Sequence, residues 1–132
     1  MQSYALRLKN GDDLKKSINN FVIAENISAG FIASSVGCVK NATIRNACAT
    51  TIKTFDEKLE IISLNGTLSK NGCHLHISLS NADFQLIGGH LCEGTIVDTT
   101  CELIIVKLDN YEFNRVLDDE TGYNELTIKN LL

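Results

Sequence analysis

The strongest constraint on the fold is the alternation of side chains in residues 74–79, which read His-Leu-His-Ile-Ser-Leu. Polar residues occupy positions 74, 76 and 78, and aliphatic residues occupy the positions between them. A repeat of two is the side-chain repeat of a β-strand, in which alternate residues point to the same face of a sheet. His74 and His76 should therefore project from one face of a strand whose other face is buried.

A second strand should return alongside the first. Residues 80–83 (Ser-Asn-Ala-Asp) are typical of a turn, and residues 86–91 (Leu-Ile-Gly-Gly-His-Leu) form the return limb. A chain that folds back about Asp83 brings position 76 opposite position 90, and position 74 opposite position 92. Facing residues of an antiparallel pair have Cβ atoms about 5 Å apart, so all 3 histidines of the chain should converge on one face. The glycines before His90 permit a bulge or the close approach of another group.

Three neutral imidazoles on one hairpin form a candidate site for a divalent metal. Zinc is often held by three protein nitrogens with a fourth position left for water or substrate, and imidazole also suits nickel and cobalt. The ligands must be neutral, so binding should weaken as the pH falls below about 6.5. The alternative interpretation is that these are ordinary surface or partly buried histidines. Cys73 and Cys92 flank the histidines and could approach the site, but no pair of cysteines has Cys-x-x-Cys spacing.

Size and composition predict one globular domain over residues 1–132, with 44% hydrophobic residues and a net charge of −4. This charge argues against a phosphate-binding surface, which usually needs a basic stripe. No run approaches the roughly 20 apolar residues of a membrane span, and the N-terminus lacks the apolar core of a signal peptide. A cytoplasmic location is therefore expected. The 5 cysteines form no disulfide framework and are interpreted as reduced core residues.

The remaining patterns predict an α+β domain built on a largely antiparallel sheet with one main helix. The helix should span residues 13–25, with Asp12 as its N-cap and with Leu14, Ile18, Phe21 and Val22 on its buried face. Residues 50–58 should form a polar excursion, and the chain should end in a short extended or helical tail after a turn at residues 121–123. Strands are expected at residues 1–8, 31–39 with a break at Gly37, 41–49, 59–68 and 101–108.

His-Leu-His-Ile-Ser-Leu at residues 74–79, followed at this separation by Gly-Gly-His-Leu at residues 88–91, is a specific combination. Further stretches accompany it at Arg7, residues 11–14, 35–37 and 59–66, Glu102, Arg115 and residues 121–126. Together they resemble the plants-and-prokaryotes conserved (PPC) domain, in the form in which it occurs alone in bacteria and archaea. The resemblance covers nearly the whole chain.

The resemblance implies a curved sheet with the acetolactate-decarboxylase-like fold, a homotrimer, and a metal, usually zinc, held by His74, His76 and His90. In plants the domain follows an AT-hook, whose Arg-Gly-Arg-Pro core binds DNA. This chain has no proline and so no such hook, which leaves DNA binding as an expectation from family naming alone. Phe84 stands where the family usually has glycine. A bulky residue tolerates a positive φ poorly, so this loop should take another turn type.

The favoured functional hypothesis is a trimeric, metal-binding domain with a regulatory or DNA-associated role, which binds copies of itself and has another protein as a candidate partner. This hypothesis favours a binding domain over an enzyme without deciding between them. Trimer formation would also cover the edges of the sheet. The alternative is a metal-dependent enzyme that acts on a small keto acid in the manner of acetolactate decarboxylase. Its candidate residues are Glu60 and Glu102 as acid or base, and Arg45 and Arg115 as a carboxylate clamp.

A third hypothesis is DNA binding without a hook, which would need a local basic patch. Lys9, Lys15 and Lys16 are the candidates. A helix face with two lysines is usually only solvated, and a true complex with DNA should weaken steeply as salt is added.

Overall fold

The computed structural model describes residues 1–132 and contains one α-helix, one short 3-10 helix and nine β-strands. The helix α1 spans Leu14–Ala24, and the 3-10 helix η1 spans Ala47–Ala49. The strands are β1 (Gln2–Lys9), β2 (Gly30–Arg45), β3 (Ile52–Phe55), β4 (Leu59–Leu68), β5 (His74–Ser80), β6 (Leu86–Leu91), β7 (Ile96–Lys107), β8 (Tyr111–Leu117) and β9 (Asn124–Asn130). The one α-helix falls short of the length and apolarity that a bilayer crossing requires.

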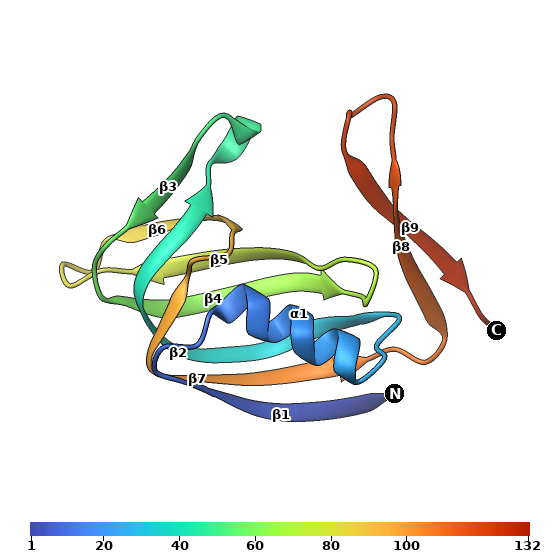
Figure 1. Cartoon of the computed structure of the whole chain (residues 1–132), viewed down its shortest axis with the longest axis horizontal. Helices are drawn as coiled ribbons and strands as arrows, with labels where there is room; N and C mark the ends of the chain where they lie inside the picture. The colour runs from blue at the N-terminus through green and yellow to red at the C-terminus, as the bar shows by residue number, and fades with distance from the viewer.

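Seven of the strands form one curved sheet in the order β1-β7-β2-β4-β5-β6, with β3 paired to β2, and every strand pair is antiparallel. The sheet curls back on itself, because β6 at the end of this order also pairs with the last residues of β2. The long strand β2 therefore contacts β7, β4, β3 and β6 (Figure 1). The predicted antiparallel α+β architecture with a curved sheet and a single helix is confirmed.

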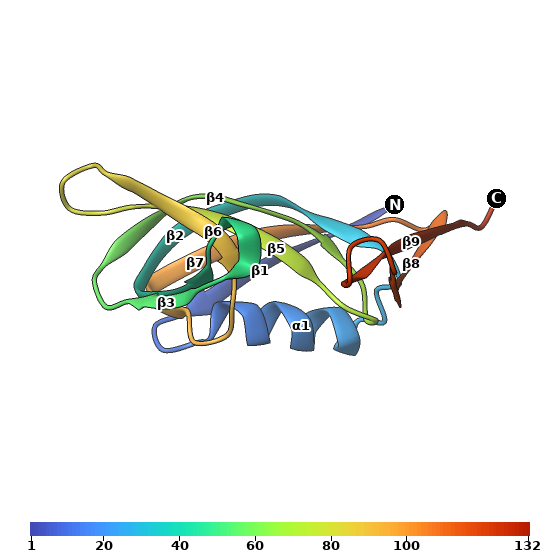
Figure 2. The ribbon, with the colours of Figure 1, turned by 90° about the horizontal axis from the view of Figure 1, so that it is seen from above.

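The helix lies against one face of the sheet (Figure 2). Leu14, Ile18 and Val22 are fully buried there, as their spacing predicted, and Phe21 is half-buried against the core. The N-cap is Asp13 and not the expected Asp12, because the Asp13 side chain accepts a hydrogen bond from the backbone N–H of Lys16. The Asp12 carboxylate instead accepts from the backbone N–H of Lys9 and closes the turn after β1.

The middle of the chain differs from the expected strand pattern. The strand β2 runs through the predicted break at Gly37, where a register shift against β7 replaces an interruption. It ends at Arg45 and is followed by η1, so the expected strand over residues 41–49 is too long. Part of the predicted polar excursion pairs with the end of β2 as the exposed strand β3. These two strands form one arm that projects from the sheet (Figure 1).

The last two strands form a second arm, a two-stranded hairpin, in place of the expected tail. The predicted turn at residues 121–123 is confirmed, because it lies between these two strands. The hairpin is fastened to the sheet near Phe113, which is 7% exposed. The Phe113 N–H donates to the Ser28 carbonyl at 2.9 Å, and its carbonyl accepts from the Ser69 hydroxyl at 2.9 Å. The two arms stand on either side of a gap in the ribbon (Figure 1).

The loop between β5 and β6 corrects the expectation for Phe84, which adopts a positive φ of 63°. The Asn81 carbonyl accepts from the Phe84 N–H, and the Asn81 side chain accepts from the backbone N–H groups of Asp83 and Gln85. A turn followed by one left-handed residue is a common hairpin connection. These hydrogen bonds hold Phe84 in a conformation that glycine adopts at lower cost.

Replacing Phe84 by glycine should stabilise the protein by up to about 1 kcal/mol, because it removes a left-handed strain that exceeds the added chain entropy. Little packing is lost, since the Phe84 side chain is 90% exposed. The measurement is urea denaturation of the wild type and the variant. The matched control is Ala82→Gly in the same loop, where φ is not positive. This change should destabilise the protein, because glycine adds chain entropy there without relieving strain. Equal destabilisation by both substitutions would contradict the strain at residue 84.

Candidate metal centre

The register of three neighbouring strands places two histidines and an arginine in one row. His76 of β5 pairs with His90 of β6, as predicted from the turn at residue 83, and His90 pairs in turn with Arg45 of β2. Cross-strand neighbours share a face and have Cβ atoms about 5 Å apart. The β5–β6 ladder ends at this pair, so the expected pairing of residues 74 and 92 is not formed. The backbone N–H of Cys92 donates instead to the Thr43 carbonyl of β2.

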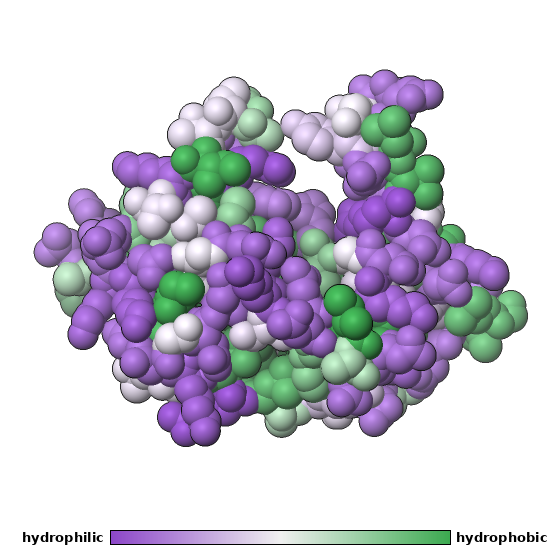
Figure 3. Space-filling model, viewed as in Figure 1, coloured by the Kyte–Doolittle hydropathy of each residue, from purple (hydrophilic) through white to green (hydrophobic).

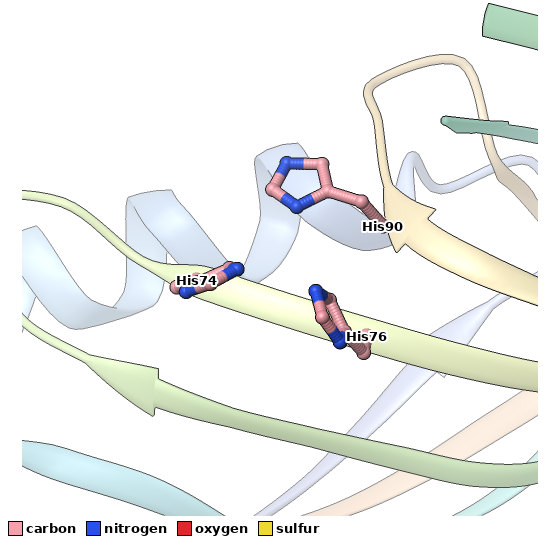
Figure 4. Close-up of side chains that lie close together, drawn as sticks. All are labelled: His74, His76 and His90. Carbon is pink, nitrogen blue, oxygen red and sulfur yellow. The ribbon is translucent and has the colours of Figure 1, made fainter. Parts of the chain in front are cut away.

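His74 completes the cluster from the next position on the same face of β5. Its ring centroid lies 4.9 Å from that of His76 and 5.2 Å from that of His90, and the His76 and His90 centroids are 5.7 Å apart. One ligand nitrogen from each ring lies within 4.8 Å of the other two. Figure 4 shows the three rings turned toward a common point between β5 and β6. The predicted convergence of three imidazoles is therefore present in the structure.

Glycine at position 89 allows the strands to approach closely enough for this row to form. A Cβ atom at Gly89 would lie 2.4 Å from the backbone carbonyl oxygen of Arg45. A real Cβ atom does not tolerate such a contact, so any other residue would push β6 away from β2. The glycine before His90 thus permits the close approach that the sequence indicated.

A cleft of about 280 Å³ lies beside the histidines and between the two arms. Figure 3 shows that the molecule is hollowed between these arms. One wall comes from Arg45, His74 and His90, and the other comes from the β8–β9 hairpin. The lining residues of that hairpin are Arg115, Tyr123, Asn124 and Glu125.

Both arginines of the cleft lack a carboxylate partner. The structure has three ion pairs, and none of them uses an arginine. The Arg115 guanidinium donates a hydrogen bond of 3.0 Å to the Thr67 hydroxyl, and Thr67 is the cross-strand neighbour of His74. The Arg45 Nε is buried without a hydrogen-bond partner, as is the Nδ1 of His90.

Burial and neighbouring positive charge favour the neutral form of two of the histidines. Burial lowers the pKa of His90 to about 4, and Arg45 and His74 act in the same direction. Burial is also the main cause of the lowered pKa of His74, followed by His76 and Arg115, and Glu125 opposes the shift. Neutral imidazole is the form that binds a metal, so at His74 and His90 protons should compete with a metal at lower pH than the ordinary histidine pKa implies.

The other residues singled out in the sequence lie in several places. Arg45 and Arg115 line the cleft, whereas Glu60 and Glu102 are exposed and line none of the cavities beside the histidines. The Cys73 thiol lines the cleft but donates to the Ser69 carbonyl, and burial raises its pKa. The Cys92 thiol donates to the His90 carbonyl. Neither cysteine belongs to the group of potential ligands formed by the histidines.

Sequence reasoning assigned no role to Glu125, the carboxylate that lines the cleft. It lies in a region expected to be an extended or helical tail, so nothing in the local pattern placed it near residues 74–90. The available signal was the stretch at residues 121–126, which belongs to the same family pattern as the histidine motif.

The stability of the metal-free protein should fall as the pH is lowered from about 6.5 toward 4. In this window the unfolded chain protonates position 90 while the folded protein keeps His90 neutral, so acid favours unfolding. Urea denaturation at pH 7 and pH 5 measures the effect. His90→Asn should flatten the dependence, because asparagine does not titrate. If the stability of this variant depended equally steeply on pH, His90 would not be the cause of the pH dependence.

The comparisons with known proteins agree with the family resemblance of the histidine motif at residues 74–91. A sequence profile of the Plants and Prokaryotes Conserved (PCC) domain matches residues 1–109. The chain is also 39% identical over 129 residues to the bifunctional protein GlmU of two Synechococcus strains, JA-3-3Ab and JA-2-3B'a(2-13). That similarity covers 98% of this chain but 21% and 20% of those proteins. The chain therefore spans about a fifth of the length of these curated relatives.

Solved structures of similar proteins share the fold over almost the whole chain. A hypothetical protein from Salmonella enterica has a TM-score of 0.95 and 35% identity, over 99% of this chain and 95% of that one. A candidate DNA-binding protein from Bacteroides thetaiotaomicron has a TM-score of 0.84 and 26% identity, over 95% and 91%. A metal-containing protein from Archaeoglobus fulgidus has a TM-score of 0.82 and 31% identity, over 96% and 94%. Because the family profile covers 109 of the 132 residues, this chain belongs to the plants-and-prokaryotes conserved domain family.

Proposed function

We propose that this chain forms a homotrimer, each subunit of which binds one divalent metal ion, most simply zinc, through His74, His76 and His90. The observation that carries the proposal is the convergence of three imidazole nitrogens within 4.8 Å of one another. Two of these rings are cross-strand neighbours on a rigid antiparallel pair, so their approach is fixed by the backbone. The metal-containing relative from Archaeoglobus fulgidus supports the proposal.

The donor set suits such an ion. Zn–N bonds are about 2.0–2.1 Å long, so small rotations of the rings would bring the nitrogens to the spacing of a tetrahedral site. The buried Nδ1 of His90 lacks a partner, which leaves it available to an ion or to a water molecule that orients the ring. A bound divalent ion would keep an open position for water or an oxyanion and would act there as a Lewis acid.

The trimer is supported by apolar side chains on the face of the sheet opposite α1. Their exposed fractions are 37% for Phe31, 56% for Val36, 55% for Ile62 and 38% for Ile104. Val36 and Ile104 come from the adjacent strands β2 and β7 and line one shallow pocket, so these two side chains are not scattered singly. Exposed apolar patches of this kind mark interaction surfaces, and copies of this chain are the occupants we propose.

A second candidate is a metal-dependent enzyme that acts on a small keto acid and shares the acetolactate-decarboxylase-like fold. The placement of Arg45 and Arg115 beside the histidines favours it. The acid or base would then be Glu125, which lines the cleft, in preference to Glu60 and Glu102, which do not. Turnover of acetolactate-like acids by the purified, metal-loaded protein would separate this candidate from a domain that only binds.

DNA binding has no part in the proposal. The net charge of the chain is −4, and Lys16 of the candidate lysine patch lies 4.0 Å from the carboxylate of Glu93. A regulatory role, a protein partner and a cytoplasmic location remain predictions from the sequence.

Replacing His76 by alanine should remove most of the bound metal and leave the fold intact, because His76 is exposed and projects away from the core. Elemental analysis of the purified protein is the measurement, with circular dichroism to check the fold. Glu60→Ala is the matched control and should leave the metal content unchanged, since Glu60 is exposed on β4 and lines none of the cavities beside the histidines. Equal metal content in the wild type and His76→Ala would mean that the histidines are not a site.

Light scattering at micromolar concentration should give three times the 14.5 kDa mass of one chain. Val36→Asp should shift the protein toward monomer, because it buries a charge in the proposed contact. Glu57→Asp, a conservative change at an exposed residue, should leave the mass unchanged. A stable mass near 14.5 kDa for the wild type would exclude the trimer.

A further inference from the structure

We infer that the cleft beside the three histidines binds a small dicarboxylate, one end of which is held by Arg45 and Arg115. The inference rests on the proposed metal site, because the other carboxylate would occupy the open position of the ion held by the histidines. It adds a ligand class to the metal centre and assigns the binding role to two residues outside the cluster of metal ligands.

The first observation is the unmet hydrogen-bonding capacity of Arg45. This arginine lies next to His90 in the cross-strand row, and its Nε is buried without an acceptor. A buried N–H of a charged group without a partner costs free energy. A carboxylate is the acceptor whose geometry matches the guanidinium fork, which can donate two parallel hydrogen bonds.

The second observation is that Arg115 reaches the same cleft from a different part of the chain. It projects from β8, and its hydrogen bond of 3.0 Å to Thr67 fixes the guanidinium beside His74. This bond uses a neutral hydroxyl, so the positive charge of Arg115 is not balanced by a carboxylate within 4.0 Å. Two uncompensated guanidinium groups therefore line one cleft.

The charge around the cleft indicates the charge of its occupant. Glu125 is the one carboxylate among the lining residues, against Arg45 and Arg115. A divalent ion on the histidines would add two further positive charges, because the three imidazole ligands are neutral. A dianion would offset this excess, whereas a neutral or cationic ligand would not.

The volume of the cleft limits the size of this dianion. About 280 Å³ lies just below the roughly 300–1,000 Å³ found for small-molecule sites. A metabolite-sized molecule with two carboxylates fits these dimensions, with one group near the arginines and the other near the histidines. Because the cleft is lined by both arms, such a ligand would also link the β8–β9 hairpin to the sheet.

The experiment uses protein loaded with cobalt(II), whose visible spectrum reports changes in the ligands of the metal, and malonate as the probe. Malonate should change the spectrum in a saturable manner, and its neutral diamide, malonamide, should not. Arg45→Gln and Arg115→Gln should each weaken malonate binding by about tenfold or more, as expected for a lost charge-assisted hydrogen bond. Arg7→Gln is the matched control, because Arg7 is exposed on β1 and does not line the cleft.

Cobalt content is measured on every sample before titration, which separates the two proposals. Wild-type protein that holds no cobalt would overturn the metal site and this inference with it. Protein that holds cobalt but does not respond to malonate, or responds equally to malonamide, would overturn the dicarboxylate site alone. Equal malonate affinity in the wild type and both arginine variants would overturn the role of the arginines. If a variant fails to fold, the comparison of malonate with malonamide on the wild type still decides whether the site selects the carboxylate anion over its neutral amide.

Discussion

The register of β5, β6 and the end of β2 is the constraint on which the candidate site depends. A shift of one residue between two of these strands would turn His76 or His90 to the opposite face. The close backbone approach at two glycines supports the observed register, because a Cβ atom at Gly88 would lie 2.5 Å from the Ile77 carbonyl and one at Gly89 would lie 2.4 Å from the Arg45 carbonyl. The absence of side chains at the two glycines before His90 therefore permits the strand spacing on which the candidate metal centre depends.

The same strands hold the core and the site on opposite faces. Leu75, Ile77 and Leu79 of β5 are buried, while His74 and His76, which alternate with them, are exposed. The apolar face contributes most of the free energy of folding at these strands, so the polar face is free to carry groups that bind ligands. The curl of the sheet adds an arginine to this polar face, because it returns β6 to the end of β2 and so places Arg45 next to His90.

Sequence patterns predicted the structure correctly where the contacting residues are close together in the chain. The alternation in residues 74–79 and the turn residues after them predicted the β5–β6 hairpin and the pairing of residues 76 and 90. Arg45 and Arg115 were named as candidates for a carboxylate clamp, but local patterns could not place them beside the histidines, because their positions depend on the curl of the sheet and on the placement of the last hairpin. The β8–β9 hairpin was missed because its strands are largely exposed and carry no clear apolar alternation. Phe84 was misjudged because the hydrogen bonds of Asn81 outweigh the local preference of a bulky residue.

The arginines of the cleft would influence metal binding in two opposing ways. Arg45 helps to lower the pKa of His90, and Arg115 helps to lower that of His74, so both favour the neutral imidazoles that a metal requires. The same positive charge would repel the metal ion itself. An anion bound between the arginines and the ion would remove this repulsion, so each ligand should raise the affinity of the other by the same factor. If the proposed metal and dicarboxylate both bind in this cleft, their binding would therefore be one coupled equilibrium, in which each ligand favours the binding of the other.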